Sequence, residues 1–100
     1  MDKTLINTDA NGASKNVKDI VFWGNGDTFK LISKASSVAE GWMKSTKAME
    51  IEGVGCVVQV TTQQGTNVAE AITFVLGVKI QEETTAEKVG TVTSRKLLKI

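Results

Sequence analysis

The chain has few side chains that could do chemistry, and the residue types that it lacks limit that chemistry most. It contains no histidine and a single cysteine, Cys56. Histidine is the usual general base and a common zinc ligand, and one cysteine cannot complete a structural zinc site. A cysteine–histidine pair that would activate the thiol is excluded as well. We therefore expect no catalytic residue, no cofactor and no metal, and we expect Cys56 to be a small core residue.

Hydroxyl and lysine side chains are the remaining candidates for nucleophilic catalysis. They lie close in sequence at residues 44–47, Lys-Ser-Thr-Lys, and at residues 94–96, Ser-Arg-Lys. A lysine can activate a neighbouring hydroxyl, so a Ser–Lys pair is the one nucleophilic arrangement left open. We favour exposed strand faces for both segments, and hence a protein that is not an enzyme.

Three further segments superficially match ligand-binding loops. Residues 7–12, Asn-Thr-Asp-Ala-Asn-Gly, place oxygen ligands at alternate positions before a glycine, as at the start of a calcium loop. The twelfth position, however, is Lys18, where a bidentate glutamate is needed. The glycine pairs at 24–26 and 53–55 lack the lysine and hydroxyl of a phosphate-binding loop. We interpret all three as turns or strand breaks.

Charge and hydropathy argue against several classes of partner. Twelve basic and 11 acidic residues give a formal net charge of +1, without a run of like charge. Nucleic acid is therefore an unlikely partner and an anionic membrane is not expected. The uncharged apolar run near residues 72–78 is too short to span a bilayer, and the N-terminus lacks the apolar region of a signal peptide. A single cysteine fits folding in a reducing cytoplasm.

Residues 56–80 are the most informative stretch, because they predict two β-strands around a polar turn at 63–67. Branched and aromatic residues dominate both sides of that turn. Val57 and Val58 would point to opposite faces, and so would Phe74 and Val75. Strands that are apolar on both faces are central in a sandwich or are covered by another subunit. We therefore favour self-association, with Val57 and Val75 as possible interface residues.

Residues 17–33 predict another hairpin. A strand at 17–23 would lead into Gly-Asn-Gly-Asp at 24–27, and a second strand would follow at 28–33. Asn-Gly between apolar runs is typical of a type I′ turn. If Phe22 faces the core, Trp23 faces the other side of its strand, where it could contact a partner.

Residues 36–51 allow two interpretations. Alternation from Trp42 onwards predicts an imperfect strand, whereas Val38, Trp42 and Met49 share one face of a helix over 38–49. Ser37 followed by Glu40 has the spacing of a helix cap. We expect at most one short helix, near 36–42 or 84–88. Trp42 lies near lysines and is a further possible interface residue.

Together these elements predict a polar N-terminal arm or loop at 1–16 and a single β domain at 17–100. The last part of the chain predicts one or two strands, at 89–94 and 96–100. The fold class is mainly β, a compact antiparallel β-sandwich or barrel of about six strands.

Two segments, EGWMKSTKAMEI at 40–51 and CVVQVTTQQGTNVAEAITFV at 56–75, resemble stretches of small, mostly uncharacterised proteins of tailed bacteriophages. The resemblance implies a virion accessory component, such as a head-decoration, stabilising or tail-associated protein. An early phage protein that binds and inhibits a host protein is the alternative. Its partners would be further copies of itself, as a homo-oligomer, and other virion proteins, without a small-molecule substrate. It would be located in the virion or in the host cytoplasm.

Overall fold

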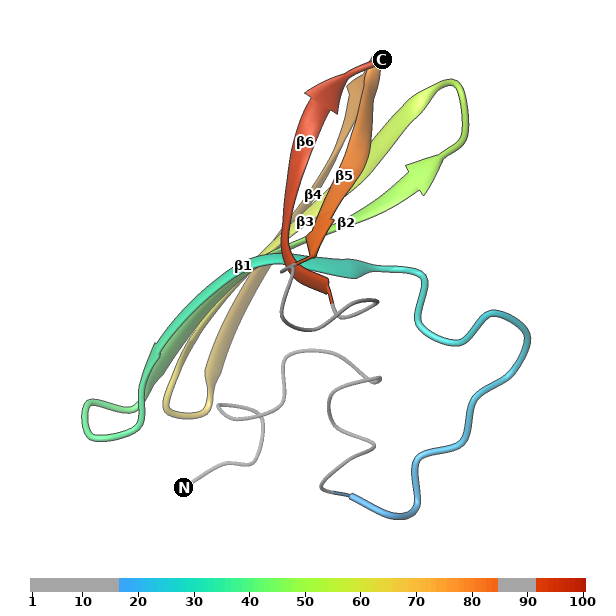
Figure 1. Ribbon diagram of the computed structural model, residues 1–100. Coiled ribbons are helices and arrows are strands. Elements are labelled where there is room, and N and C mark those ends of the chain that lie inside the picture. Colours follow the sequence, from blue (N-terminus) through green and yellow to red (C-terminus); the bar gives the residue numbers. More distant parts are fainter. Residues whose placement is uncertain (1–16, 85–91) are drawn as a thin grey trace.

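The computed structural model describes residues 17–84 and 92–100, and within these ranges the chain forms six strands and no helix (Figure 1). A four-stranded antiparallel sheet has the order β1-β2-β3-β4, and a separate antiparallel pair consists of β5 and β6. The strands are β1 (Lys30–Ser37), β2 (Trp42–Ile51), β3 (Gly55–Gln64), β4 (Asn67–Leu76), β5 (Val78–Thr84) and β6 (Val92–Lys99). The predicted fold class, a mainly β antiparallel domain of about six strands, is confirmed.

The β3–β4 hairpin predicted at the centre of the chain is confirmed, with a shorter loop than expected. Gln64 pairs with Asn67, so that only Gly65 and Thr66 connect the strands. Gly65 has a φ of +58°, and no non-glycine residue of the described part has a positive φ. This combination is the type II′ turn that matches the twist of paired strands.

Near 36–42, where we expect at most one short helix, no helix forms, because a hairpin turn joins β1 to β2 there. The Ser37 hydroxyl accepts a hydrogen bond from the Glu40 backbone N–H at 3.1 Å. The Gly41 N–H donates to the Ser37 carbonyl at 2.8 Å, and Gly41 has a φ of +76°. The Ser37–Glu40 spacing thus closes a turn, not a helix. The alternative prediction, a helix over 38–49, is wrong, since β2 pairs by hydrogen bonds with β1 on one side and β3 on the other.

The hairpin predicted over 17–33 is wrong, because residues 17–29 contain turns but no strand. The turn forms one residue earlier than predicted, with the Gly26 N–H bonded to the Trp23 carbonyl at 3.1 Å. Gly26 itself has a φ of +72°, which bends the chain again. The Asp27 carboxylate then accepts the Phe29 N–H at 3.1 Å. The chain becomes regular only at β1, which pairs with β2.

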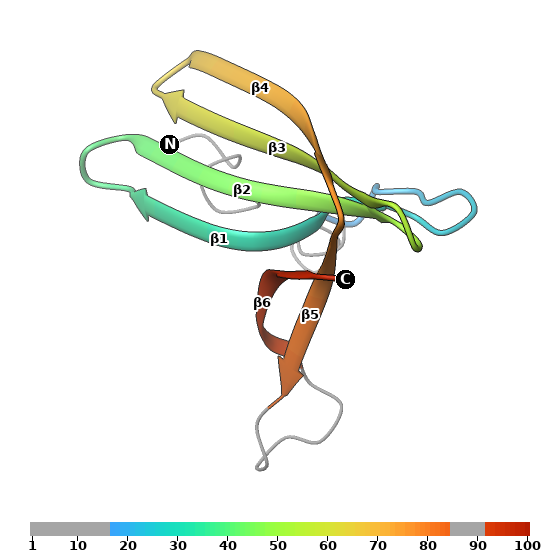
Figure 2. The ribbon, with the colours of Figure 1, turned by 90° about the horizontal axis from the view of Figure 1, so that it is seen from above.

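The strand predicted to continue to residue 80 breaks at Gly77, whose φ is +77°. There the chain leaves the four-stranded sheet and enters the β5–β6 hairpin, which lies across one end of that sheet (Figure 2). The Gly77 N–H bonds to the Val54 carbonyl at 2.8 Å, and the Ile100 N–H bonds to the Gly77 carbonyl at 2.9 Å. Gly77 is therefore a fixed corner between the two sheets.

The core lies where the β5–β6 hairpin meets the four-stranded sheet. Ala48 and Cys56 are fully buried there and Val58 is 8% exposed. Partly buried apolar residues from four strands surround them, namely Ile32, Val75, Val78, Ile80 and Leu97. Burial of these side chains holds the two sheets together.

Polar contacts also fix the hairpin to the sheet. The Ile80 N–H donates to the Glu50 carboxylate at 2.6 Å, and the Cys56 thiol donates to the Val78 carbonyl at 3.6 Å. Arg95 of β6 donates to the Leu31 carbonyl at 3.0 Å and pairs with the Glu82 carboxylate at 2.7 Å.

Several predictions fall partly or wholly outside the described residues. These are the arm at 1–16, residues 85–88 of the second possible helix, and residues 89–91 of the last strands. Thr84 ends β5, and the predicted final strands form the single strand β6. No helix long and apolar enough to cross a membrane is found in the described part of the chain.

Candidate protein-binding surface

The four-stranded sheet has an inner face, one end of which the β5–β6 hairpin covers, and an outer face on its other side. Side chains alternate between the two faces along each strand. Val58 lies on the inner face, and Val57 lies on the outer face, where it pairs with Met49 on β2 and Phe74 on β4. The sequence prediction that Val57 and Val58 point to opposite faces therefore matches the register.

The outer face of β4 carries a row of exposed apolar side chains. We refer to Val68, Ile72, Phe74 and Leu76 as the β4 stripe. Their exposed fractions are 57%, 63%, 46% and 74%. All occupy even positions of one strand and so project from the same face. Ile51 and Val54, exposed by 41% and 44%, extend the apolar surface at the β2–β3 turn.

The ring of Phe74 occupies space that a side chain on the neighbouring strand would fill. Gly55 pairs with Leu76, and a Cβ atom added to Gly55 would lie 2.9 Å from Cζ of Phe74. The same atom would lie 2.3 Å from the Val75 carbonyl oxygen. The Phe74 ring therefore reaches across β3 at a position where only glycine leaves room for it.

Among the described residues, no strand pairs with the outer edge of β4, because β4 is the last strand of the sheet. The Gly65–Thr66 turn closes on the Gln64–Asn67 pair, so Asn67 directs its hydrogen-bonding groups towards β3. At the other end, the odd-numbered Gly77 bonds to Val54. Since this direction alternates along an antiparallel strand, the even positions direct their N–H and C=O groups outwards. These positions are Val68, Glu70, Ile72, Phe74 and Leu76.

The two edges of this sheet differ in their protection. The β1 edge carries Lys30 and Lys34 and has a register irregularity between Leu31 and Ser33. Lysines and bulges of this kind prevent a foreign strand from pairing with an edge. The β4 edge carries one charged residue, Glu70, in ten positions, and its pairing with β3 has no bulge. Of the two edge strands of this sheet, β1 and β4 (Figure 2), only β4 therefore presents a long, regular and largely apolar edge.

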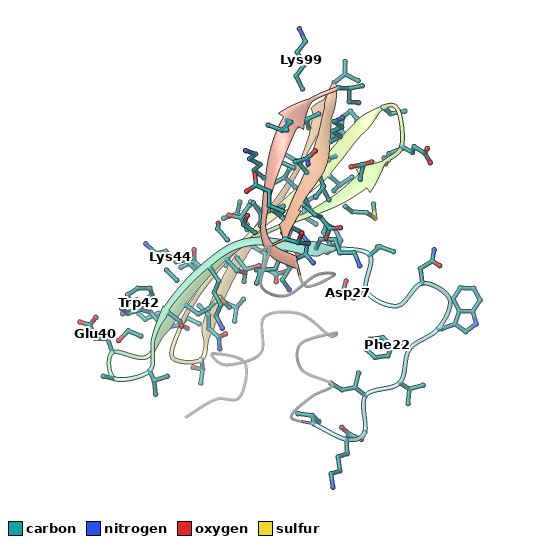
Figure 3. The ribbon with its side chains drawn as sticks, in the orientation of Figure 1. Phe22, Asp27, Glu40, Trp42, Lys44 and Lys99 are labelled. Carbon is teal, nitrogen blue, oxygen red and sulfur yellow. The ribbon has the colours of Figure 1, made fainter. Side chains whose placement is uncertain are left out.

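The two tryptophans lie apart in the structure. Trp23 is 92% exposed in the irregular segment before β1, next to Val21, which is 90% exposed. Trp42 is half-buried at the start of β2 and donates from Nε1 to the Glu40 carboxylate at 3.1 Å. Figure 3 shows Trp42 and Phe22, the neighbour of Trp23, at opposite ends of the molecule. The tryptophans therefore cannot form one contact patch.

The two valines predicted as possible interface residues, Val57 and Val75, lie on opposite faces of the sheet. Val57 is half-buried on the outer face beside the β4 stripe. Val75 lies on the inner face, packed against the core together with Val78 of β5. The chain itself thus covers the face of Val75, whereas Val57 stays next to exposed apolar surface. Sequence reasoning missed Ile72 and Leu76, although both lie in the uncharged run that it noted.

Grooves among the described residues contain charged side chains that take part in hydrogen bonds and ion pairs. A groove of about 550 Å³ between residues 25–30, β2 and β5 contains Glu50 and Glu82. The Ile80 N–H and Arg95 hold these two carboxylates. A smaller groove of about 240 Å³ lies beside Trp42 and Lys44. No group of three residues that could hold a metal ion is found among the described residues.

The hydroxyl and lysine candidates lie in two strands, β2 and β6. Ser94 contacts the Glu83 carboxylate at 3.5 Å, and Lys96 pairs with the same carboxylate at 3.0 Å. A hydrogen bond from Lys96, together with its charge, lowers the pKa of Glu83. In β2, Ser45 and Lys47 project from one face and Lys44 and Thr46 from the other, and Ser45 is 4% exposed.

Cys56 is a core residue, as the sequence predicted. Burial raises the pKa of its thiol, and the negative charge of Glu50 raises it further. A nucleophilic cysteine needs the opposite shift, towards the thiolate.

The model of the Lockin family matches residues 1–92. The chain belongs to the Lockin family. The matched range of this Lockin chain includes the whole four-stranded sheet and therefore the β4 edge. No curated protein and no solved structure matches it.

Proposed function

We propose that this Lockin-family chain is a non-enzymatic accessory or structural protein of a tailed bacteriophage. It acts through protein–protein contacts, as a virion decoration, stabilising or tail-associated component. The phage setting is supported by the resemblance of residues 40–51 and 56–75 to small phage proteins. The mode of action is supported by the β4 edge.

The observation that carries this proposal is the difference between the two sheet edges. A soluble β-protein ordinarily blunts an exposed edge, because the unpaired N–H and C=O groups are a template for another strand. This chain has lysines and a bulge on β1, but on β4 it has four exposed apolar side chains and one carboxylate. An edge left open beside an apolar stripe fits recognition by strand addition.

The chemistry of the described residues supports a role without catalysis. Cys56 is buried with a raised thiol pKa, and the serine and lysine of β6 are engaged with Glu83. Both grooves are lined by ordinary polar and apolar residues.

Light scattering and co-sedimentation test the proposal together. At low micromolar concentration, we expect the purified chain to self-associate or to co-sediment with purified capsids or tails of the phage that encodes it. Replacement of Ile72 by lysine puts a charge on the open edge and should reduce the association. A wild-type chain that stays monomeric and binds neither capsids nor tails would contradict the proposal.

A second candidate function is binding to a host protein, and the exposed segment 21–23 favours it. Val21 and Trp23 are almost fully exposed, and tryptophan is enriched among residues that dominate binding energy. For a host-directed inhibitor we expect one stoichiometric host partner, whose binding Trp23→Ala abolishes and Ile72→Lys leaves intact. The opposite sensitivity would favour the β4 edge and the first candidate.

A further inference from the structure

We propose that β4 pairs antiparallel with β4 of a second copy of the chain, about a two-fold axis at Ile72. The inference rests on the proposed function, because it names the partner of the open edge. The result is a continuous eight-stranded sheet in the order β1-β2-β3-β4 followed by the same strands of the second copy in reverse.

The backbone of β4 is complementary to itself in this register. Its outward-facing positions form a set that is symmetric about Ile72. Ile72 would face Ile72 of the second copy, while Val68 would face Leu76 and Glu70 would face Phe74. Outward-facing residues on two antiparallel strands exchange both of their backbone hydrogen bonds. Every outward N–H and C=O group of β4 thereby gains a partner.

The side chains favour the same register. The two Ile72 side chains contact each other, and the large apolar residues at the strand ends, Val68 and Leu76, lie opposite one another. The only charged residue, Glu70, faces an aromatic ring. An axis at Glu70 would place two carboxylates directly opposite, which is destabilising. An axis at Phe74 would leave Val68 and Glu70 without β4 partners, because β4 ends at Leu76.

The protection of β1 explains why the occupant is β4 and not another edge. Pairing of β4 with β1 of a second copy would be head-to-tail and would continue without closing. Lys30, Lys34 and the bulge at Leu31/Ser33 oppose that contact. In the two-fold pairing, these protected edges become the two outer edges of the sheet. A net charge of only +1 per copy adds little repulsion between the copies.

Analytical ultracentrifugation of charge variants tests whether β4 is the contact. We expect a wild-type dimer, and we expect Ile72→Lys to raise its dissociation constant by at least about 100-fold, because two lysines replace a buried isoleucine pair. Ala69→Lys is the matched control: it adds the same charge to the same exposed strand, but projects from the inner face. It should leave the dimer within a few-fold of wild type. Circular dichroism establishes that both variants are folded.

Cysteine cross-linking tests the register. In the proposed dimer the two Ile72 Cα atoms lie about 5.5 Å apart, within the range that a disulfide spans. The two Ala71 Cα atoms are diagonal neighbours at roughly 7–8 Å, beyond that range. Ile72→Cys should therefore form covalent dimers under mild oxidation, whereas Ala71→Cys should not. The wild-type chain, with Cys56 buried, is the control.

The outcomes of these experiments separate the β4–β4 dimer from the proposed function. Faster cross-linking at 71 than at 72, or a dimer that survives Ile72→Lys, overturns the inference. A monomer that nevertheless co-sediments with capsids or tails overturns the inference and leaves the proposed function standing. A monomer that binds neither overturns both.

Discussion

Replacement of Gly55 by alanine should destabilise the protein, because β4 passes too close to Gly55 for any side chain. The added Cβ would lie 2.3 Å from the Val75 carbonyl oxygen and 3.1 Å from Cα of Leu76, both backbone atoms of β4. The 2.3 Å overlap is with a backbone oxygen and cannot be relieved by rotation of a side chain, so the backbone of β3 or β4 must move. Gly55 has no positive φ, and backbone strain therefore plays no part in the expected loss.

The magnitude follows from two opposing contributions. Overpacking of this kind costs typically about 1–3 kcal/mol. Alanine returns roughly 0.5–1 kcal/mol in a strand, because it loses less conformational entropy on folding than glycine does. Because the closest overlap is with a backbone atom, we place the cost at about 2–3 kcal/mol and expect a net loss of about 1–2 kcal/mol in the free energy of unfolding. For a domain of this size the loss corresponds to a fall in Tm of roughly 5–15 °C.

Urea unfolding followed by circular dichroism measures the loss, and two further variants identify its cause. Gly41→Asn is the control, because a side chain at Gly41 meets open space and asparagine tolerates a positive φ. It should stay within about 0.5 kcal/mol of wild type. Adding Phe74→Ala to Gly55→Ala should not restore stability, since the closest contact is with the backbone. Wild-type stability of Gly55→Ala, or rescue by Phe74→Ala, would show that the Cβ of alanine does not clash with the backbone of β4.

Three further predictions concern the core, the hairpin and the pH dependence. Val58→Ala should cost about 2 kcal/mol in urea unfolding, because Val58 is buried in the core. In the dissociated chain, at protein concentrations too low for the proposed dimer, Ile72→Ala should cost less than about 1 kcal/mol, because Ile72 is mostly exposed there. Arg95→Ala should cost about 1–2 kcal/mol and speed hydrogen exchange in β5 and β6 more than in β3, since it removes the bond to the Leu31 carbonyl. The lowered pKa of Glu83 means that its pairing with Lys96 stabilises the fold above the ordinary glutamate pKa, and that this contribution disappears as the pH falls through the lowered value. Lys96→Ala should reduce the fall in Tm between neutral and acidic pH, and an unchanged fall would contradict this assignment.

The β-rich architecture could be predicted from the sequence because its signals are local. The branched residues around Gly65 define β3 and β4, and the alternation after Trp42 defines β2. The error at 17–33 came from a local signal that the rest of the fold does not use. Asn25-Gly26 does lie in a turn, but β1 finds its partner in β2 because the Ser37–Gly41 turn brings those strands together. A turn signal alone does not specify which strands pair.

The binding surface could be predicted only in part, because it depends on the order of the strands. The sequence shows that residues 71–78 lack charge, but not that β4 ends the sheet. Nor does the apolar run reveal that the strand breaks at Gly77. This break directs the chain into β5, so that Val78 and Ile80 pack against the core. The corner at Gly77 places Val75 inside the protein and leaves Ile72 and Phe74 outside. Residues of one strand thus become core or surface residues because of Gly77, which lies further along the chain.

In our proposal, the outer edge of β4 is the edge that another strand occupies. Amide hydrogen exchange measured by NMR at increasing protein concentration tests it most directly. In dilute solution the amides of Ala69, Ala71 and Thr73, bonded to β3, should exchange slowly, while those of Glu70, Ile72 and Phe74 should exchange fast. At concentrations where the chain associates, both sets should exchange slowly. Fast exchange of Glu70, Ile72 and Phe74 in the associated protein would contradict the claim.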